Sequence, residues 1–428
     1  MIGSGFFIAP AALAPYGTTA IIGWGVMAVG AVCLGMVFAR LARIAPATGG
    51  PYAYTRMGFG RFAGFFVAWG YWISIWASLP AMSAALVGYL GELIPGMKGQ
   101  PQIGLAVGLG AIWLVTAINL RGVKEAGIFM SATTYTKLVP FIGISVFGLF
   151  WVDWNNFAVI NPTDKPFFSA LLATAPLTMF AFLGIESATV PAGNVINPRR
   201  TIPRATVIGT LITSGVYILG TTVVLGVMSR DQLMSSQAPF ADAARAMWGD
   251  WAAIVISLAA VISTVGALNG WTLLMSQVPA AAAKDGAMPA IFGRISARGV
   301  PAFALIISAA LATALYLMES SDAAALVQFY DLIVNLSADA AMIPYVFCSV
   351  VEAVLYVTRK PVSRALRIGS MTPPAIGAFV FAIGTVIGAG PEAGMWSLIL
   401  VLLAVPVWIL LRKESAEAGS NPDDTIPL

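Results

Sequence analysis

Hydrophobic and polar positions along this chain fall into long blocks rather than short periods. Apolar runs of roughly 20 residues or more, the length that crosses a bilayer as a helix, recur from end to end and are separated by short polar segments. Full spans are predicted near residues 19–42, 61–91, 102–120, 130–152, 167–195, 205–228, 251–282, 301–318, 323–357, 371–389 and 394–411. The pattern predicts an all-α integral membrane protein.

The apolar stretch at 3–15 is too short to cross a bilayer and is typical of half a span. The sequence opens directly on it, without the basic segment that begins a cleavable signal peptide. We expect a truncated first helix, which gives about 11.5 spans in all.

Basic residues alternate between the loops as the positive-inside rule requires. They gather after the second, fourth, sixth, eighth, tenth and last spans, whereas the opposite loops hold only Lys98, Lys165, Arg230 and Arg245. This predicts a multi-pass protein of the cell (inner) membrane with a cytoplasmic C-terminus, in which residues 412–428 form a cytoplasmic tail.

Composition narrows the class of protein. The chain is 59% hydrophobic and 10% charged, with a mean hydropathy of +0.86. This composition is typical of a protein embedded in a lipid bilayer. The net charge of +4 is scattered between spans and indicates no nucleic-acid partner. The chain has no histidine, and its two cysteines both fall in apolar runs, so we expect no metal and no cofactor.

A faint internal repeat divides the chain. The segment that starts at Pro51, after the second span, resembles the one that starts at Pro239, after the seventh span, allowing one inserted residue. Five spans separate the two units, and an odd number inverts topology. Inverted repeats with one interrupted helix each are typical of secondary transporters. The predicted units are a first repeat at 1–152, a second at 153–357 and two C-terminal spans at 358–411.

The stretch Phe182–Ser187, which reads Phe-Leu-Gly-Ile-Glu-Ser, interrupts an apolar segment with a glycine and a carboxylate. Opened backbone at membrane depth is tolerated only where it faces protein or a watery cavity. Glu186 is therefore a candidate proton carrier or partner of a cationic substrate. The alternative is a structural glutamate held by backbone amides of the broken helix.

Gly3-Ser4-Gly5 lies at a comparable offset in the first repeat. It predicts a second break, whose following half-helix would point free amides at an anion. Taken alone, the triplet is equally consistent with an ordinary helix contact.

Two further polar features lie inside spans. Lys137 is well inside the fifth span, where it is either a protonation site or a lysine that extends to the cytoplasmic edge. Asn335 and Asp339 are four residues apart on the tenth span and share a helix face that could line a pathway.

Several motifs in order resemble those of a known family. They are Gly3-Ser4-Gly5-Phe6-Phe7 with Pro10, Gly49-Gly50-Pro51-Tyr52-Ala53-Tyr54, Phe182–Ala188 with Asn197-Pro198-Arg199-Arg200, Gly270-Trp271-Thr272-Leu273-Leu274 with Asp285-Gly286, and Ile343-Pro344-Tyr345. The chain resembles, over nearly its whole length, the amino acid–polyamine–organocation (APC) superfamily, and within it the basic amino acid/polyamine antiporters, above all those that exchange arginine for agmatine.

The resemblance implies a LeuT-like core of two inverted five-helix repeats with two extra C-terminal helices. It implies that Ser4 and Gly5 receive a substrate carboxylate, and that carbonyls around Phe182 and Gly184 hold the α-amino group. The other residues that it places at the site are Phe180, Trp271 and Ser74 for substrate contact, and Glu186 and Tyr71 for proton coupling and gating.

Three departures from the family pattern matter. Leu79 stands where the antiporters have an asparagine, and Phe180 replaces a tryptophan, so strict arginine specificity is not expected. Lys137 is similar instead to a lysine of proton-coupled amino acid transporters in the same superfamily.

We therefore expect a secondary active transporter, not an enzyme. Its partners would be a small amino acid or amine and protons, with arginine/agmatine or ornithine/putrescine exchange as the leading pairs, and a homodimer is left open. The alternative is proton-coupled uptake of neutral or broad-range amino acids through Lys137. A channel would need a continuous polar pore, and a membrane enzyme would need a nucleophile with its base; the sequence favours neither.

Overall fold

The computed structural model describes residues 3–46, 49–97, 99–122, 133, 139–190, 192–318, 323–358 and 368–417, which form helices joined by short loops. The helices are α1 (Ser4–Leu13), α2 (Thr18–Ile44), α3 (Pro51–Phe59), α4 (Arg61–Leu93), α5 (Pro101–Arg121), an apolar helix at Val139–Trp151, α7 (Phe167–Phe182), α8 (Pro198–Val227), α9 (Arg230–Met234), α10 (Pro239–Trp248), α11 (Asp250–Lys284), α12 (Ala302–Met318), α13 (Ala323–Thr358), α14 (Ile368–Gly388), α15 (Gly390–Leu402) and α16 (Ala404–Glu417). No strand occurs in these ranges.

Eight helical segments of this part of the chain are long and apolar enough to cross a membrane. Shorter apolar helices at Val139–Trp151, Ala302–Met318 and Pro373–Gly388 complete the series. In order along the chain they match the predicted full spans, so the expectation of an all-helical, multi-span membrane protein is confirmed. Helices satisfy most of their polar backbone groups internally, which is what a bilayer requires.

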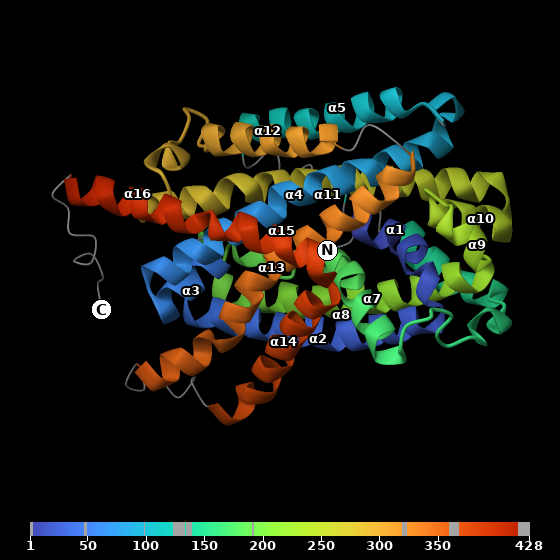
Figure 1. Ribbon diagram of the computed structural model, residues 1–428, viewed down its shortest axis with the longest axis horizontal. Helices are drawn as coiled ribbons and strands as arrows, with labels where there is room; N and C mark the ends of the chain where they lie inside the picture. The colour runs from blue at the N-terminus through green and yellow to red at the C-terminus, as the bar shows by residue number, and fades with distance from the viewer. Residues whose placement is uncertain are drawn as a thin grey trace.

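The long helices α4 and α11 form the antiparallel centre of the molecule and pack on each other more extensively than any other pair of described helices. The short helices α3 and α10 lie at opposite ends of this pair (Figure 1). We call the end at α3 the inner end, after the predicted cytoplasmic loops, and the end at α10 the outer end.

The junctions α3–α4 and α10–α11 have the same local geometry. Gly60 and Gly249 adopt φ values of 86° and 87° with ψ of −175° in both cases, a conformation that favours glycine. Each glycine amide donates to the carbonyl of the arginine four residues earlier, Arg56 or Arg245, at 2.9 Å. The match agrees with the proposed inverted repeats at 1–152 and 153–357, whose boundaries stay a prediction.

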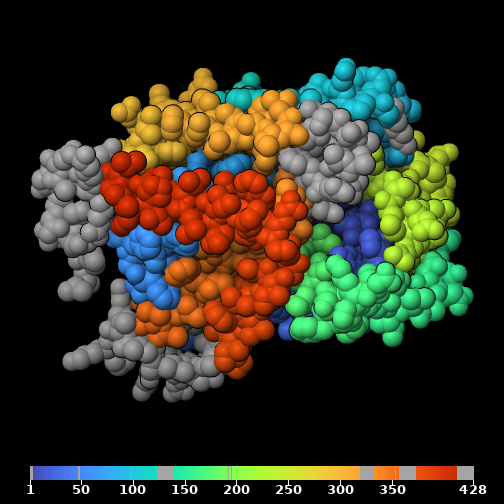
Figure 2. All heavy atoms as spheres, viewed as in Figure 1, coloured from blue at the N-terminus to red at the C-terminus, as the bar shows by residue number. Residues whose placement is uncertain are grey.

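The buried side chains form two large apolar clusters, one around α1, α2, α7 and α8 and one around α4, α11 and α12. Trp271 of α11 packs against both clusters and so lies at their junction. The C-terminal helices α15 and α16 lie across one face of the molecule, where α15 contacts α13 and α4 (Figure 2). This frame holds α1 and α7 in the interior.

Candidate functional site

The predicted break in the sixth span is present in the structure. Helix α7 ends at Phe182, its cap residue Leu183 turns to ψ 137°, and Gly184 adopts φ +98°. That value lies in the region that residues with a Cβ rarely adopt, which explains the glycine. The chain resumes helical geometry only in the short 3₁₀ turn Ser187–Thr189.

The break leaves backbone carbonyls without the hydrogen bonds that a continuous helix would give them. The Gly184 carbonyl accepts from the amide and the hydroxyl of Ser187, at 3.2 and 2.7 Å. Within the described part of the chain, the carbonyls of Phe182 and Leu183 accept no hydrogen bond. Two buried acceptors therefore remain at the end of α7, which is the arrangement that a substrate ammonium group needs.

The start of α1 supplies the opposite polarity. Gly3 precedes the helix with extended backbone and has no side chain that could cap the first amides. The Phe6 amide donates to the Gly3 carbonyl at 3.1 Å. The amides of Ser4 and Gly5, both buried, have no acceptor among the described residues. The first amides of a helix carry partial positive charge, so they are suited to a carboxylate.

Gly5 holds the two helix ends together. A Cβ at this position would lie 2.9 Å from the Cα of Ala181 and 2.9 Å from the Cδ1 of Phe180, both on α7. Only glycine lets the backbones approach this closely. The structure thus brings the two predicted breaks, Gly3–Gly5 and the Phe182–Ser187 stretch, next to each other.

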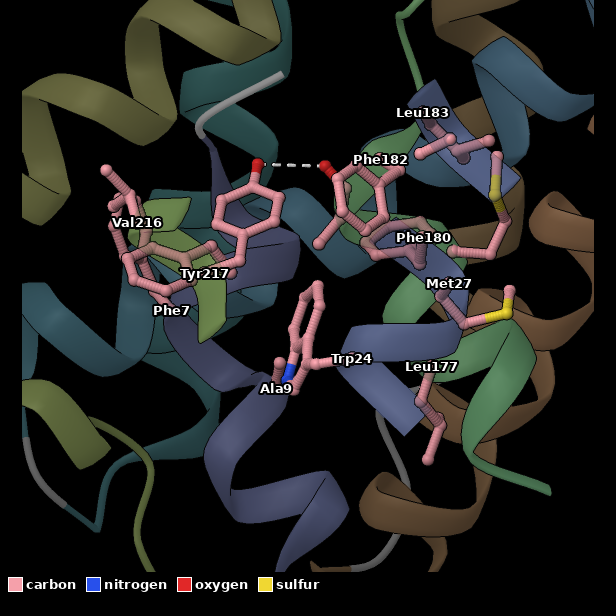
Figure 3. Close-up of a cluster of buried hydrophobic side chains, with 14 of the residues drawn as sticks. Phe7, Ala9, Trp24, Met27, Leu177, Phe180, Phe182, Leu183, Val216 and Tyr217 are labelled. Carbon is pink, nitrogen blue, oxygen red and sulfur yellow. Dashed lines mark hydrogen bonds between the residues drawn. The ribbon is translucent and has the colours of Figure 1, made fainter. Parts of the chain in front are cut away.

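Aromatic side chains of α1, α2, α7 and α8 gather in one buried cluster beside this contact (Figure 3). Tyr217 of α8 donates its hydroxyl to the Ala181 carbonyl at 2.9 Å and stacks on Phe6, with ring centroids 4.8 Å apart. Phe182 packs edge-on against Trp24 with centroids 5.6 Å apart. Tyr217 fixes the last turn of α7, and nothing in the sequence pattern singled it out.

Glu186 lies at the centre of a hydrogen-bonded cluster on the inner side of the break. Its carboxylate is fully buried and accepts from the Tyr71 hydroxyl at 2.5 Å and, through its other oxygen, from the Tyr345 hydroxyl. Buried carboxylates persist in proteins when donors satisfy them in this way. Sequence reasoning assigned roles to Glu186 and Tyr71 but gave none to Tyr345, although the Ile343-Pro344-Tyr345 motif pointed to it.

Helix α3 covers this cluster from the inner end. The Gly49 amide, just before α3, donates to the Val190 carbonyl at 3.0 Å, which ties α3 to the segment after the break. The Tyr52 hydroxyl donates to Asp285 Oδ2 at 2.9 Å, and Arg56 pairs with the same carboxylate. Burial, reinforced by the Asp285 carboxylate, raises the pKa of Tyr52 well above its usual range, so the hydroxyl keeps its proton and this bond persists at physiological pH.

The other predicted site residues are less closely joined to the break. Ser74 is buried on α4 and donates to the Tyr71 carbonyl at 2.8 Å, so it supports the helix next to Tyr71. Trp271 is half-buried, and Phe180 is buried beside Gly5. Lys137 lies outside the described residues.

Asp339 and Asn335 lie on α13. Asp339 is buried, and within the described residues neither of its carboxylate oxygens has a hydrogen-bond partner; the same holds for the side-chain oxygen of Asn335. A Cβ on Gly394 of α15 would lie 3.8 Å from Asp339 Oδ2, so this carboxylate faces the C-terminal helices. Their place on a pathway stays a prediction.

No cluster of three or more histidine, cysteine, aspartate or glutamate side chains is found in the described ranges. The polar groups of the site are instead backbone amides and carbonyls, one carboxylate and two tyrosine hydroxyls. A pair of helix ends that present opposite polarity inside a multi-span membrane protein defines the class of secondary transporters with a midplane site.

Comparisons with known proteins agree with this class. The amino acid permease family model matches residues 1–411. The putrescine transporter PotE of Escherichia coli strain K12 is 31% identical over 405 residues, which cover 94% of this chain and 91% of that protein. PotE of Haemophilus influenzae is 33% identical, with coverage of 83% and 81%, and the cadaverine/lysine antiporter of Escherichia coli K12 is 32% identical, with coverage of 82% and 79%.

The chain belongs to the amino acid permease family of the APC superfamily. It is thus a multi-pass membrane transporter rather than an enzyme, as the sequence predicted.

Proposed function

We propose that this transporter exchanges a basic amino acid for an amine across the bacterial cell membrane, with ornithine/putrescine and lysine/cadaverine as the leading pairs. The single observation that carries the proposal is the close approach of α1 and α7 at Gly5. It supports a site in which the buried amides at the start of α1 and the buried carbonyls at the end of α7 act together. The relatives' names, a putrescine transporter and a cadaverine/lysine antiporter, support the substrate class.

The amides of Ser4 and Gly5 would receive the carboxylate of the amino acid, and the carbonyls of Phe182 and Leu183 its α-ammonium group. An amine product lacks the carboxylate, so it would use the carbonyls and leave the amides to water. The second ammonium group would then reach toward Phe180 and Trp271, whose ring faces attract a cation.

The side-chain end of the proposed site favours a flexible ammonium over arginine. Leu79 and Phe180 are both buried and apolar, so their side chains offer no hydrogen-bond acceptor to the five donors of the planar guanidinium group. A primary ammonium group satisfies its needs with fewer partners, which makes a diamine the better fit than agmatine.

Glu186 would couple the site to protons and to the inner gate. Tyr71 from α4 and Tyr345 from α13 hold it while the inner side is closed. Opening would separate these groups and expose the carboxylate to water. Together with the predicted cytoplasmic C-terminus, this gives an alternating-access scheme in which the two repeats move around a fixed site.

The test is flux into liposomes that contain the purified protein. Vesicles loaded with putrescine should take up labelled ornithine faster than empty vesicles, and lysine with cadaverine is the second pair. Neutral amino acids driven by a proton gradient form the comparison arm, in which Lys137→Ala should abolish uptake if that lysine carries the proton. Gradient-driven uptake of neutral amino acids without counterflow would replace the proposal by this alternative.

A further inference from the structure

A half-buried ion cluster at the outer end of the α4–α11 pair mirrors the contacts that hold α3 at the inner end. Arg245 of α10 donates from Nη2 to Glu92 Oε2 at 2.5 Å, where Glu92 is in the last turn of α4. At the other end, Arg56 of α3 pairs with Asp285, the residue that caps the end of α11. In each case a short helix binds the far end of the long helix from the other predicted repeat.

The two arginines hold equivalent places in the chain. Each lies four residues before the glycine that joins its short helix to the following long helix, and each carbonyl accepts the amide of that glycine at 2.9 Å. A faint sequence repeat starting at Pro51 and Pro239 brings the arginines near the same register. The inner and outer contacts are thus related by position as well as by chemistry.

The outer contact includes a carboxylate that is largely shielded from solvent. The side chain of Glu92 is only 8% exposed, whereas that of Asp250, which also accepts from Arg245, is 86% exposed. A carboxylate this deeply covered depends on its partner, because removing the partner leaves a charge with little water around it. Asp242 accepts from Arg245 Nη1 at 2.7 Å and fixes the guanidinium group.

We propose that Arg245 and Glu92 are positioning residues whose ion pair holds the outer end closed during transport; we call this pair the outer latch. The contacts of Arg56 and Tyr52 with Asp285 form the inner latch, which holds the inner end closed. The two latches compete, because each favours a different conformation of the transporter. This proposal rests on the exchange cycle proposed above. A substrate or mutation shifts the balance of conformations only by its differential effect on them. Breaking the outer latch should therefore favour the state that is open outward and closed inward, and breaking the inner latch should do the reverse.

The chain contains its own reporter for the inner state. Cys348 of α13 is fully buried beneath α3, with its Sγ 3.8 Å from the Pro51 carbonyl and 3.9 Å from the Thr55 hydroxyl. Removal of α3 would expose this thiol. The other cysteine, Cys33, is replaced by alanine in every variant so that only Cys348 reacts.

The experiment measures the rate at which a membrane-permeant maleimide labels Cys348 in liposomes without substrate. Asp285→Asn should speed labelling about fivefold, and Glu92→Gln should slow it about fivefold. Asp250→Asn is the matched control, because the same carboxylate-to-amide change at an exposed position should leave the rate within about twofold. The double variant Glu92→Gln/Asp285→Asn should return toward the unmodified rate.

Opposite shifts from the two latches support the proposal, since general loosening of the fold would speed labelling in both. Faster labelling in Glu92→Gln, or an unchanged rate, would overturn it. If Glu92→Gln does not fold, Arg245→Lys gives the same direction with a smaller shift, and no shift there counts equally against the latch. Labelling needs no substrate, so these outcomes are independent of whether the flux assay finds ornithine/putrescine exchange.

Discussion

The Tyr71 hydroxyl donates to Glu186 Oε1 at 2.5 Å and joins two elements that are 115 positions apart in sequence. Tyr71 lies within the unbroken helix α4, whereas Glu186 lies in the open turn after α7. With Tyr345 of α13 on the other carboxylate oxygen, the Glu186 side chain ties its own segment to α4 and α13 on the inner side of the proposed site. Movement of the segment after the break relative to α4 or α13 must separate at least one of these contacts.

The hydroxyls of Tyr71 and Tyr345 are the two donors to the Glu186 carboxylate. Tyr71→Phe and Tyr345→Phe should each destabilise the closed state by about 1–3 kcal/mol, because each leaves a buried carboxylate oxygen without its donor. Thermal unfolding in detergent measures the loss. The double variant should fall short of the sum, since both donors act on the same group. Strict additivity would mean that the tyrosines do not work through Glu186.

Glu186→Gln should flatten the pH dependence of exchange. Glutamine fits the same space but carries no charge at any pH, so a proton can no longer enter or leave at this position. Initial rates between pH 5 and 8 in liposomes provide the measurement. A pH profile of unchanged shape in this variant would remove Glu186 from proton coupling.

Gly5→Ala should abolish substrate binding while leaving a folded protein with lowered stability. The added Cβ would meet backbone of α7 at 2.9 Å, so the start of α1 must move away from the end of α7. Gly25→Ala on α2 is the matched control, because nothing lies within 4 Å of its Cβ. There, alanine should be neutral or stabilise by about 0.5–1 kcal/mol. Equal binding in both variants would contradict the role of the close approach.

Gly184→Ala tests the turn itself. At φ +98°, a Cβ strains the backbone whatever space surrounds it, and we expect a cost on the order of 1–3 kcal/mol together with weaker binding. Calorimetric titration with ornithine and thermal unfolding separate the two effects. Binding at full strength would show that this turn does not shape the site.

Much of the architecture follows from the sequence because bilayer crossing leaves a strong signal. The apolar runs predicted the spans, and glycine with glutamate at membrane depth predicted the break after Phe182. The pairing of the breaks at Gly3–Gly5 and Phe182–Ser187 was inferred from the repeat, and the structure supplies a contact between them, that of Gly5 with Ala181.

The roles of Tyr345, Tyr217 and Arg245 could not be read from pattern. A tyrosine in a span looks the same whether it packs or donates, and only the fold brings Tyr345 within reach of Glu186, 159 positions away in sequence. Arg245 likewise counted only as a charge in an outer loop. Its partner Glu92 comes from a different helix, and such pairings depend on tertiary contacts that local periodicity does not contain.

The central claim is exchange of a basic amino acid for its amine at the site between α1 and α7. Counterflow in liposomes tests it most directly: labelled ornithine is added outside vesicles that contain putrescine, cadaverine, agmatine or buffer alone. The account predicts rapid uptake with putrescine or cadaverine inside, slower uptake with agmatine, little with buffer, and none in the Gly5→Ala variant. Uptake that is the same with and without internal amine would contradict it.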